Sequence, residues 1–437
     1  MELHEIKRIM SESGVQYLLL QFTDVLGNLK GVEVGSSQLE QVLEQPIPMD
    51  ASSVLGRYRS KEIDGRLRPD LDTFVVMPFP RDGIQGARLI GDLTRPDGEP
   101  DTNCPRQILR NVARELTDEG LDITIAPEVE FYLFPIDDDG RPSLHPSDDS
   151  GYLDFVADQP GQAFRRELVA VMEQVGVTVQ HAHHELAPGQ HELALQPMKP
   201  LECADAIVTL RFMAKALAGG HGLMATFMPK PLYGSAGSGM HLSVYGQKNK
   251  KDLFTDESGR MTVEAKYFLG GLLSHSAGMS LLLNPLVNSY KRLVPGHEAP
   301  THVYWSTENI EPYVRVPAGQ GRRCLEVRAP DPSCNPYLSI AAVLAAGLDG
   351  IRSKTNAGEP INKDIARLST RERGRLRVRP LPGNLGQAVD QFGKDRFLSQ
   401  ILGQDIARTL MRAKAEEWQD YIRQVHPWEL EHYLAIT

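Results

Sequence analysis

The sequence has little of several features that mark other classes of protein. It has no uninterrupted apolar run of 18 residues, and its first residues lack the apolar core of a signal peptide. Its formal net charge of -10 argues against a nucleic-acid-binding surface. Cysteine is scarce and shows no C-x-x-C spacing or dense framework, with only Cys104, Cys203, Cys324 and Cys334 present. We therefore expect a soluble cytoplasmic protein that binds neither a membrane nor a nucleic acid.

The length predicts more than one domain. A chain of 437 residues can bury a large core and exceeds one ordinary domain. Short strand patterns occupy residues 17–23 and 74–79, and a stretch rich in Pro, Gly and Asp at 95–105 separates them from a helical segment near residue 106. We predict a small domain over residues 1–100 and a larger one over 101–437.

The larger domain has a mixed pattern. Helical segments are expected near residues 106–119, 161–175, 201–218, 263–280 and 337–353, and short strand patterns alternate with them. No internal repeat or low-complexity tract is present. The pattern indicates an α+β fold in which helices back a sheet.

Two acidic pairs lie in apolar or glycine-rich surroundings. Glu128 and Glu130 alternate with apolar residues in a strand pattern, which puts both carboxylates on one face. Glu185 and Glu192 flank the turn sequence 187–190, so a hairpin can bring them together. Two carboxylates on one strand face are often only a polar edge, but they repel each other unless a cation joins them.

Two further residues complete a possible ligand set. His241 follows a flexible glycine-containing loop, and Glu326 lies in a strand pattern where it shares a face with Arg328. Oxygen-rich ligation with one imidazole suits Mg²⁺ or Mn²⁺ better than zinc or copper. Two such ions side by side are typical of phosphoryl transfer.

The short sequence motifs around these residues match the motifs of one protein family, in the same order along the chain. They are Pro48-Met-Asp-Ala-Ser-Ser-Val54, Pro127-Glu-Val-Glu-Phe131, His183-His-Glu-Leu-Ala-Pro-Gly-Gln-His-Glu192, Ala225-Thr-Phe-Met-Pro-Lys-Pro231, Gly237-Ser-Gly-Met-His241, Asn288-Ser-Tyr-Lys-Arg-Leu-Val-Pro-Gly-His-Glu-Ala-Pro300 and Glu326-Val-Arg-Ala-Pro-Asp-Pro-Ser-Cys-Asn-Pro-Tyr-Leu338. With them, the chain resembles glutamine synthetase of the bacterial type I nearly end to end.

The resemblance implies an architecture and an activity. The expected fold is an N-terminal β-grasp domain followed by a catalytic domain with a curved antiparallel sheet. The expected assembly is a homo-oligomer, a dodecamer of two hexameric rings, with each active site shared between neighbours. The implied reaction joins glutamate and ammonia at the expense of ATP, through an acyl phosphate, with two or more Mg²⁺ or Mn²⁺ ions per site.

The resemblance also assigns roles to residues. Glu130, Glu185 and Glu192 would bind one ion, and Glu128, His241 and Glu326 the other. Arg292, Arg315 and Arg328 match arginines that meet substrate carboxylate and phosphate. Gly237 matches the glycine whose backbone lies against glutamate. Asp50 matches the carboxylate that deprotonates ammonium, in the neighbour's site, and Glu298 the flap residue that shields the acyl phosphate from water.

Several positions depart from the family pattern. Ala51 and Ala236 replace a glycine and an asparagine, Gln180 replaces a glutamate near the nucleotide, and Glu308, Ile310 and Cys324 stand at positions where arginine is common. Loss of the arginine at Ile310 would cost about 10³-fold in phosphoryl transfer if neighbours such as Arg322 and Arg323 did not compensate.

These departures leave two alternatives to a glutamate-ammonia ligase. One is a γ-glutamylamide ligase that uses another amine, and the other is a catalytically weak regulatory homologue. The family's adenylylated subgroup has a tyrosine-containing motif that this chain lacks after Ile351, so we do not expect this kind of covalent regulation. Arg59 matches an arginine of the alpha-like subgroup that is tied to feedback inhibition by glutamine, so such inhibition is a hypothesis.

Overall fold

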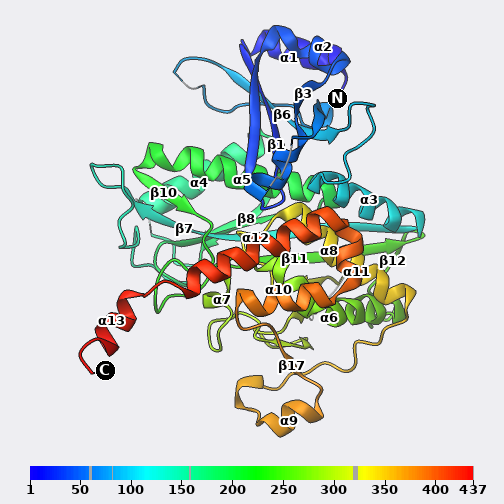
Figure 1. Cartoon of the computed structure of the whole chain (residues 1–437), viewed down its shortest axis with the longest axis vertical. Coiled ribbons are helices and arrows are strands. Elements are labelled where there is room, and N and C mark those ends of the chain that lie inside the picture. The colour runs from blue at the N-terminus through cyan, green and yellow to red at the C-terminus, as the bar shows by residue number, and fades with distance from the viewer. Residues whose placement is uncertain (59–61, 81, 157–158, 318–322, 437) are drawn as a thin grey trace.

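The computed structural model has two large sheets and a small two-stranded one among its described residues (Figure 1). It describes residues 1–58, 62–80, 82–156, 159–317 and 323–436, so Arg59 and Arg322 lie outside the described residues. The mixture of helices and mainly antiparallel sheets confirms the α+β prediction. Among the described helices, none has both the length and the apolar character that crossing a bilayer requires.

The N-terminal sheet has the strand order β2-β1-β6-β4-β3, with β5 on β6. Its strand β4 alternates buried residues with more exposed ones, whereas β1, which lies between β2 and β6, has no exposed residue. Helices α1 and α2 lie at its outer end in Figure 1, and Ile6, Leu20 and Leu89 belong to its separate core. The elements are α1 (Leu3–Glu12), β1 (Tyr17–Thr23), β2 (Leu29–Gly35), α2 (Leu39–Glu44), β3 (Ile47–Asp50), β4 (Asp64–Pro69), β5 (Val75–Val76) and β6 (Gly86–Thr94).

The larger sheet carries the predicted site. Its order is β14-β15-β16-β11-β7-β9-β8, with β10 on β7 and β12 on β11. The longest strand, β7, lies centrally and buries Val129 and Phe131 in the main core. The strands are β7 (Leu121–Pro135), β8 (Val179–His184), β9 (Gln190–Leu195), β10 (Leu223–Thr226), β11 (Met240–Lys248), β12 (Lys251–Asp252), β14 (Trp305–Ser306), β15 (Val314–Arg315) and β16 (Leu325–Val327).

Helices back this sheet, and four of them begin with proline, whose fixed φ suits the first helical position. The five predicted helices are present with ends shifted by at most three residues, as α3 (Pro105–Asp118), α4 (Pro160–Gln174), α5 (Pro200–Ala218), α6 (Val263–Leu283) and α8 (Pro336–Arg352). Helices α6 and α8 cross closely: a Cβ at Gly271 would lie 2.0 Å from the Ala346 carbonyl oxygen.

The remaining elements surround this core. They are α7 (Ser289–Arg292), β13 (His302–Val303), α9 (Thr370–Arg375), β17 (Arg379–Pro380), α10 (Leu385–Lys394), α11 (Arg396–Leu402), α12 (Gln404–Ile422) and α13 (Pro427–Tyr433). Figure 1 shows α13 extending away from the body of the molecule. Trp428, Leu434 and Ile436 in this last segment are exposed.

Candidate active site

One cavity of about 320 Å³ at the larger sheet collects most of the predicted site residues. The cross-strand register explains why. Glu128 on β7 pairs with His241 on β11, and Glu130 pairs with Glu192 on β9. Glu326 on β16 pairs with Ser243 on β11, and the predicted hairpin is formed by β8 and β9. All six predicted metal ligands line the cavity: Glu128, Glu130, Glu185, Glu192, His241 and Glu326.

Glu128, His241 and Glu326 form one group. The Nδ1 atom of His241 lies 3.3 Å from an oxygen of Glu128 and 3.8 Å from an oxygen of Glu326, and one ligand atom from each of the three lies within 4.8 Å of the others. Burial lowers the pKa of His241 to about 3, so the imidazole is neutral and can donate a lone pair to a cation.

Glu130, Glu185 and Glu192 form a second carboxylate group around the hairpin. Glu130 is held in place, because its Oε2 accepts hydrogen bonds from the Gln190 side chain at 2.8 Å and the Gly239 backbone at 2.9 Å. Burial, together with repulsion from Glu130 and Glu192, raises the pKa of Glu185 to about 8. Burial and the nearby Glu192 also raise the pKa of Glu130. Buried carboxylates that repel one another are the environment a divalent cation stabilises, so these residues fit such an ion.

Arginines lie among the acids. Arg315 Nη1 contacts Glu326 Oε2 at 3.2 Å, and Arg328 Nη1 donates to Glu326 Oε1. The Nε atoms of Arg315 and Arg328 are buried, and among the residues that the structure describes they have no hydrogen-bond partner. Arg292 is 2 % exposed and donates to the carbonyl oxygens of Arg328 and Ala329. All three arginines line the cavity, and guanidinium groups at a cavity wall suit an anionic ligand.

Gly237 lies directly against Arg292. A Cβ built at Gly237 would lie 2.6 Å from Arg292 Cγ and 2.9 Å from the Pro229 carbonyl oxygen. No larger residue therefore fits without moving Arg292 or the backbone. The Gly237 carbonyl oxygen in turn accepts a hydrogen bond from Gln190.

Asp50 and Glu298 lie in different places. Glu298 lines the cavity and has a left-handed φ of 54°, which costs energy for a residue other than glycine. Asp50, at the end of β3, is not among the residues that line the cavity of its own chain. Its Oδ1 accepts hydrogen bonds from Ser52 and from the Ile63 backbone.

The departures also separate in space. Ile310 and Ala236 line the cavity, and Ile310 is 50 % exposed there. Glu308 instead lines a neighbouring cavity of about 410 Å³, of which Ile310 is a shared wall. Gln180 and Cys324 do not line the site cavity, and Cys324 is buried against Ser243. Of the departures that the structure describes, the changes at 236 and 310 are therefore the ones that line this cavity within one chain.

Sequence reasoning missed several residues of the cavity. Tyr152, His181, His183, Gln190 and His297 also line it. His183 and Gln190 lie inside the family motif of residues 183–192. Their place in the sequence beside Glu185 and Glu192 could therefore have predicted that they line the cavity. Tyr152 reaches the cavity from a segment distant in sequence, where its ring lies edge-on to His183 with centroids 5.5 Å apart, and no periodicity marks it.

A buried polar network lies behind the hairpin. Asp148 accepts from His184 Nε2 at 2.9 Å and from the Gly189 backbone at 2.9 Å, while Arg165 Nη1 lies 2.7 Å from His191 Nδ1. The hydrogen bond from His184 helps to lower the pKa of Asp148 to about 2, despite burial. The Arg165 guanidinium excludes a cation here, so the network fixes the hairpin that carries Glu185 and Glu192.

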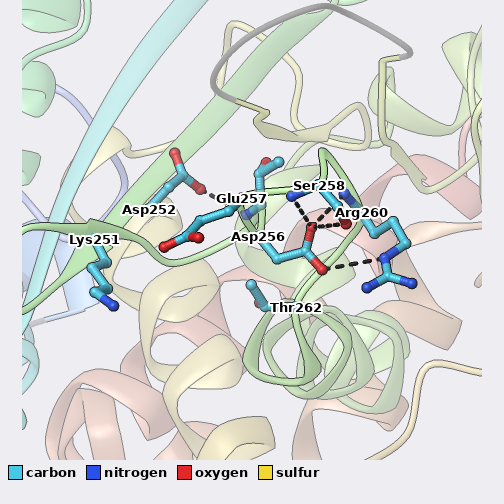
Figure 2. A pocket seen from close by; sticks show the side chains of 8 residues that line it. Lys251, Asp252, Asp256, Glu257, Ser258, Arg260 and Thr262 are labelled. Carbon is cyan, nitrogen blue, oxygen red and sulfur yellow. Dashed lines mark hydrogen bonds and ion pairs between the residues drawn. The ribbon is translucent and has the colours of Figure 1, made fainter.

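A larger cavity, of about 770 Å³, lies elsewhere, next to β12 (Figure 2). Its acids serve the local turns. Asp256 accepts from the Ser258 and Arg260 backbones, and Asp252 accepts from the Phe254 and Thr255 backbones. These two carboxylates are occupied by hydrogen bonds within their own loop, which they stabilise. Among the described residues, this cavity therefore shows no group of mutually repelling buried carboxylates like the one at β7.

Comparisons with known proteins agree with the site. The model "Glutamine synthetase, beta-Grasp domain" matches residues 14–96, and "Glutamine synthetase, catalytic domain" matches residues 102–433. The chain is 42% identical over 434 residues to glutamine synthetases of Staphylococcus epidermidis and Staphylococcus aureus, covering 98% of this chain and 97% of each relative. Among solved structures, a GmaS/ADP complex matches with a TM-score of 0.87 and 30% identity over 98% of this chain and 99% of that one. GmaS without ligand matches with a TM-score of 0.84 and 30% identity over 98% of both chains.

Proposed function

The chain belongs to the glutamine synthetase family, and we propose that it is the ATP-dependent ligase that joins glutamate and ammonia through a γ-glutamyl phosphate. The observation that carries this proposal is the cavity at β7, which holds six carboxylates, a neutral imidazole and three arginines. Such a set can bind divalent cations and polyanions together, as phosphoryl transfer requires.

The acids would hold two Mg²⁺ or Mn²⁺ ions. Glu130, Glu185 and Glu192 form one ligand set, and Glu128, His241 and Glu326 form the other. When bound, the ions neutralise phosphate charge during transfer of the γ-phosphoryl group to the glutamate carboxylate. The raised pKa values of Glu130 and Glu185 and the short distances around His241 support these sets.

The arginines would bind the anions. We assign phosphate and substrate carboxylate to Arg315, Arg328 and Arg292, because guanidinium groups match both anions. The place of all three arginines in the cavity lining supports this assignment. Arg292 is anchored by two carbonyl oxygens, and the bare α-carbon of Gly237 lets the Arg292 side chain pack directly against it at the cavity wall.

Asp50 and Glu298 would act in the second step. Ammonium must lose a proton before it can attack, and Asp50 is the carboxylate we assign to accept it. Glu298 would cover the acyl phosphate and exclude water. Because Asp50 does not line the cavity of its own chain, its action requires a neighbouring subunit.

We therefore propose a homo-oligomer, a dodecamer of two hexameric rings, with sites shared between neighbours. The extended α13 segment, with Trp428, Leu434 and Ile436 exposed, supports further contacts between subunits (Figure 1). Co-expression of Asp50→Ala chains with Glu130→Gln chains tests shared sites. Each variant alone should be inactive, and mixed rings should recover about a quarter of wild-type activity, because that share of interfaces joins two intact halves. No recovery in mixed rings of normal size would contradict shared sites.

Two broader assignments follow from the same reasoning. We propose a domain boundary at residues 100/101, supported by the separate cores and by the gap between the two family matches. We also propose a cytoplasmic location, supported by the absence of any disulfide among the four cysteines, all of which are described and buried.

The reaction is tested by phosphate release from ATP with glutamate and Mg²⁺ or Mn²⁺, comparing ammonia with primary amines and recording product mass. Ammonia-dependent release with glutamine as product is expected. Release with another amine alone would indicate a γ-glutamylamide ligase. Glu192→Gln should abolish turnover, whereas Glu257→Gln, an exposed acid in the turn of Figure 2, should not.

A further inference from the structure

Two histidines and a carboxylate form a third donor group at the mouth of the site. His181 and His183 alternate on β8, so their rings share a face, with centroids 5.7 Å apart and planes inclined by 9°. Glu192 is the direct cross-strand partner of His183, and the His183 Nε2 atom lies 3.2 Å from a Glu192 oxygen. One ligand atom from each of the three residues lies within 4.8 Å of the others.

The hydrogen bonds of His183 orient its Nε2 atom toward an anion. Its Nδ1 lies 3.1 Å from the His184 carbonyl oxygen, which can only accept, so Nδ1 carries the proton. In the neutral ring, Nε2 is then an acceptor that faces the Glu192 carboxylate. Two acceptors at this distance need a proton or a cation between them. An imidazole that donates one N–H to a backbone carbonyl and turns the other nitrogen inward is the usual arrangement of a metal ligand.

We propose that His181, His183 and Glu192 bind a borderline divalent cation such as Zn²⁺, at a site additional to the two oxygen-rich sets. Two imidazoles and one carboxylate suit zinc, whereas magnesium prefers oxygen ligands. His181 is exposed and His183 is partly exposed, so an ion can enter from solvent. Glu192 belongs to both this set and an oxygen-rich set, so zinc competes there with Mg²⁺ or Mn²⁺.

Zn²⁺ titration calorimetry on the full-length wild type, without nucleotide or amino acid, tests the site, with Co²⁺ absorption reporting imidazole ligation. The variant is His181→Gln, and the matched control is His4→Gln, an exposed histidine on α1. We expect the wild type and His4→Gln to bind Zn²⁺ alike. His181→Gln should bind at least on the order of 10- to 100-fold more weakly, because loss of an outer-shell partner alone already costs that much. Equal Zn²⁺ affinity in His181→Gln and the wild type would overturn the proposal.

A second measurement tests the shared ligand. Bound and free Mn²⁺ are distinguished by electron paramagnetic resonance, so Mn²⁺ can be titrated with and without one equivalent of Zn²⁺. Zinc should weaken Mn²⁺ binding in the wild type and lose most of this effect in His181→Gln. Unaltered Mn²⁺ binding in zinc-loaded wild type would refute the sharing of Glu192. Neither assay needs turnover, so failure of the ligase proposal and failure of the zinc proposal remain distinguishable.

Discussion

Replacement of Gly237 by alanine should weaken glutamate binding. The added Cβ would lie 2.6 Å from Arg292 Cγ, 2.9 Å from Arg292 Cβ and 2.9 Å from the Pro229 carbonyl oxygen, whereas ordinary contact begins at 3.4 Å. Arg292 cannot yield freely, because it is 2 % exposed and both terminal nitrogens are bonded to carbonyl oxygens. The strain must therefore be relieved by moving Arg292, the Gly237 backbone or both.

The size of the effect follows from the cost of overpacking. Inserting a methyl group into a packed site costs about 1–3 kcal/mol, and about 1.4 kcal/mol changes an equilibrium constant tenfold. If the displaced group is the one that binds glutamate, KM for glutamate should rise by about 10- to 100-fold in Gly237→Ala. KM for ATP should change less, because Arg315 and Arg328 are not displaced.

Steady-state phosphate release with glutamate varied measures this change, and thermal unfolding checks the fold. Gly220→Ala is the matched control, because a Cβ there meets no atom within 4 Å and its φ is not left-handed. It should leave both quantities unchanged. A Gly237→Ala enzyme with the wild-type KM for glutamate would refute the argument that this bare α-carbon holds Arg292 in position for the substrate.

Three further outcomes are expected. Ile310→Arg should raise single-turnover phosphate release by up to about 10³-fold, because the half-exposed position puts a new cation at the cavity wall; an unchanged rate would mean that this departure costs nothing. Although burial opposes it, hydrogen bonding to Asp395 and Asp349 raises the pKa of His275, so this group stabilises the fold below pH ~6.5 and loses that contribution as pH rises through its folded pKa. Denaturant unfolding of His275→Gln should lack this pH-dependent part, and an identical pH profile would contradict the ion pairs. Burial holds the pKa of Glu185 at about 8, so Mg²⁺ binding near pH 7 should release a proton, detected by calorimetry in buffers of different ionisation enthalpy, and the release should decline as pH rises through about 8.

Much of the fold was predictable from local signals. Helices α3, α4, α5 and α8 begin at prolines after polar stretches, so their starts could be read within a residue. The hairpin around Pro188 and Gly189 followed from turn chemistry. Strand β5 was the opposite case: an apolar run over 74–79 forms only Val75–Val76, because extended apolar segments also pack as irregular chain.

The composition of the site was predictable, but its pairing was not. The strand pattern around Glu326 predicts that Glu326 and Arg328 share one face, and in the structure Arg328 donates a hydrogen bond to Glu326. The approach of Arg315 to the same carboxylate depends on the register of β15 against β16. Tyr152 reaches the cavity through chain folding alone, and Asp50 does not reach it within one chain. Strand register and contacts between residues distant in sequence are set by tertiary packing, which short sequence motifs do not encode.

The pairing at Glu326 has a functional consequence. This carboxylate contacts two guanidinium groups and lies near His241, so a cation that binds Glu326 competes with Arg315 and Arg328. Both arginines line the cavity, and the terminal N–H groups freed from Glu326 would then be satisfied by phosphate. Cation and phosphate therefore reduce the cost of each other's binding. The cation replaces the arginines as partner of Glu326, and the phosphate replaces Glu326 as partner of the arginines. By linkage, the binding free energy of a metal and a nucleotide together should be more favourable than the sum of their separate binding free energies, because the arginines can exchange one anion for another.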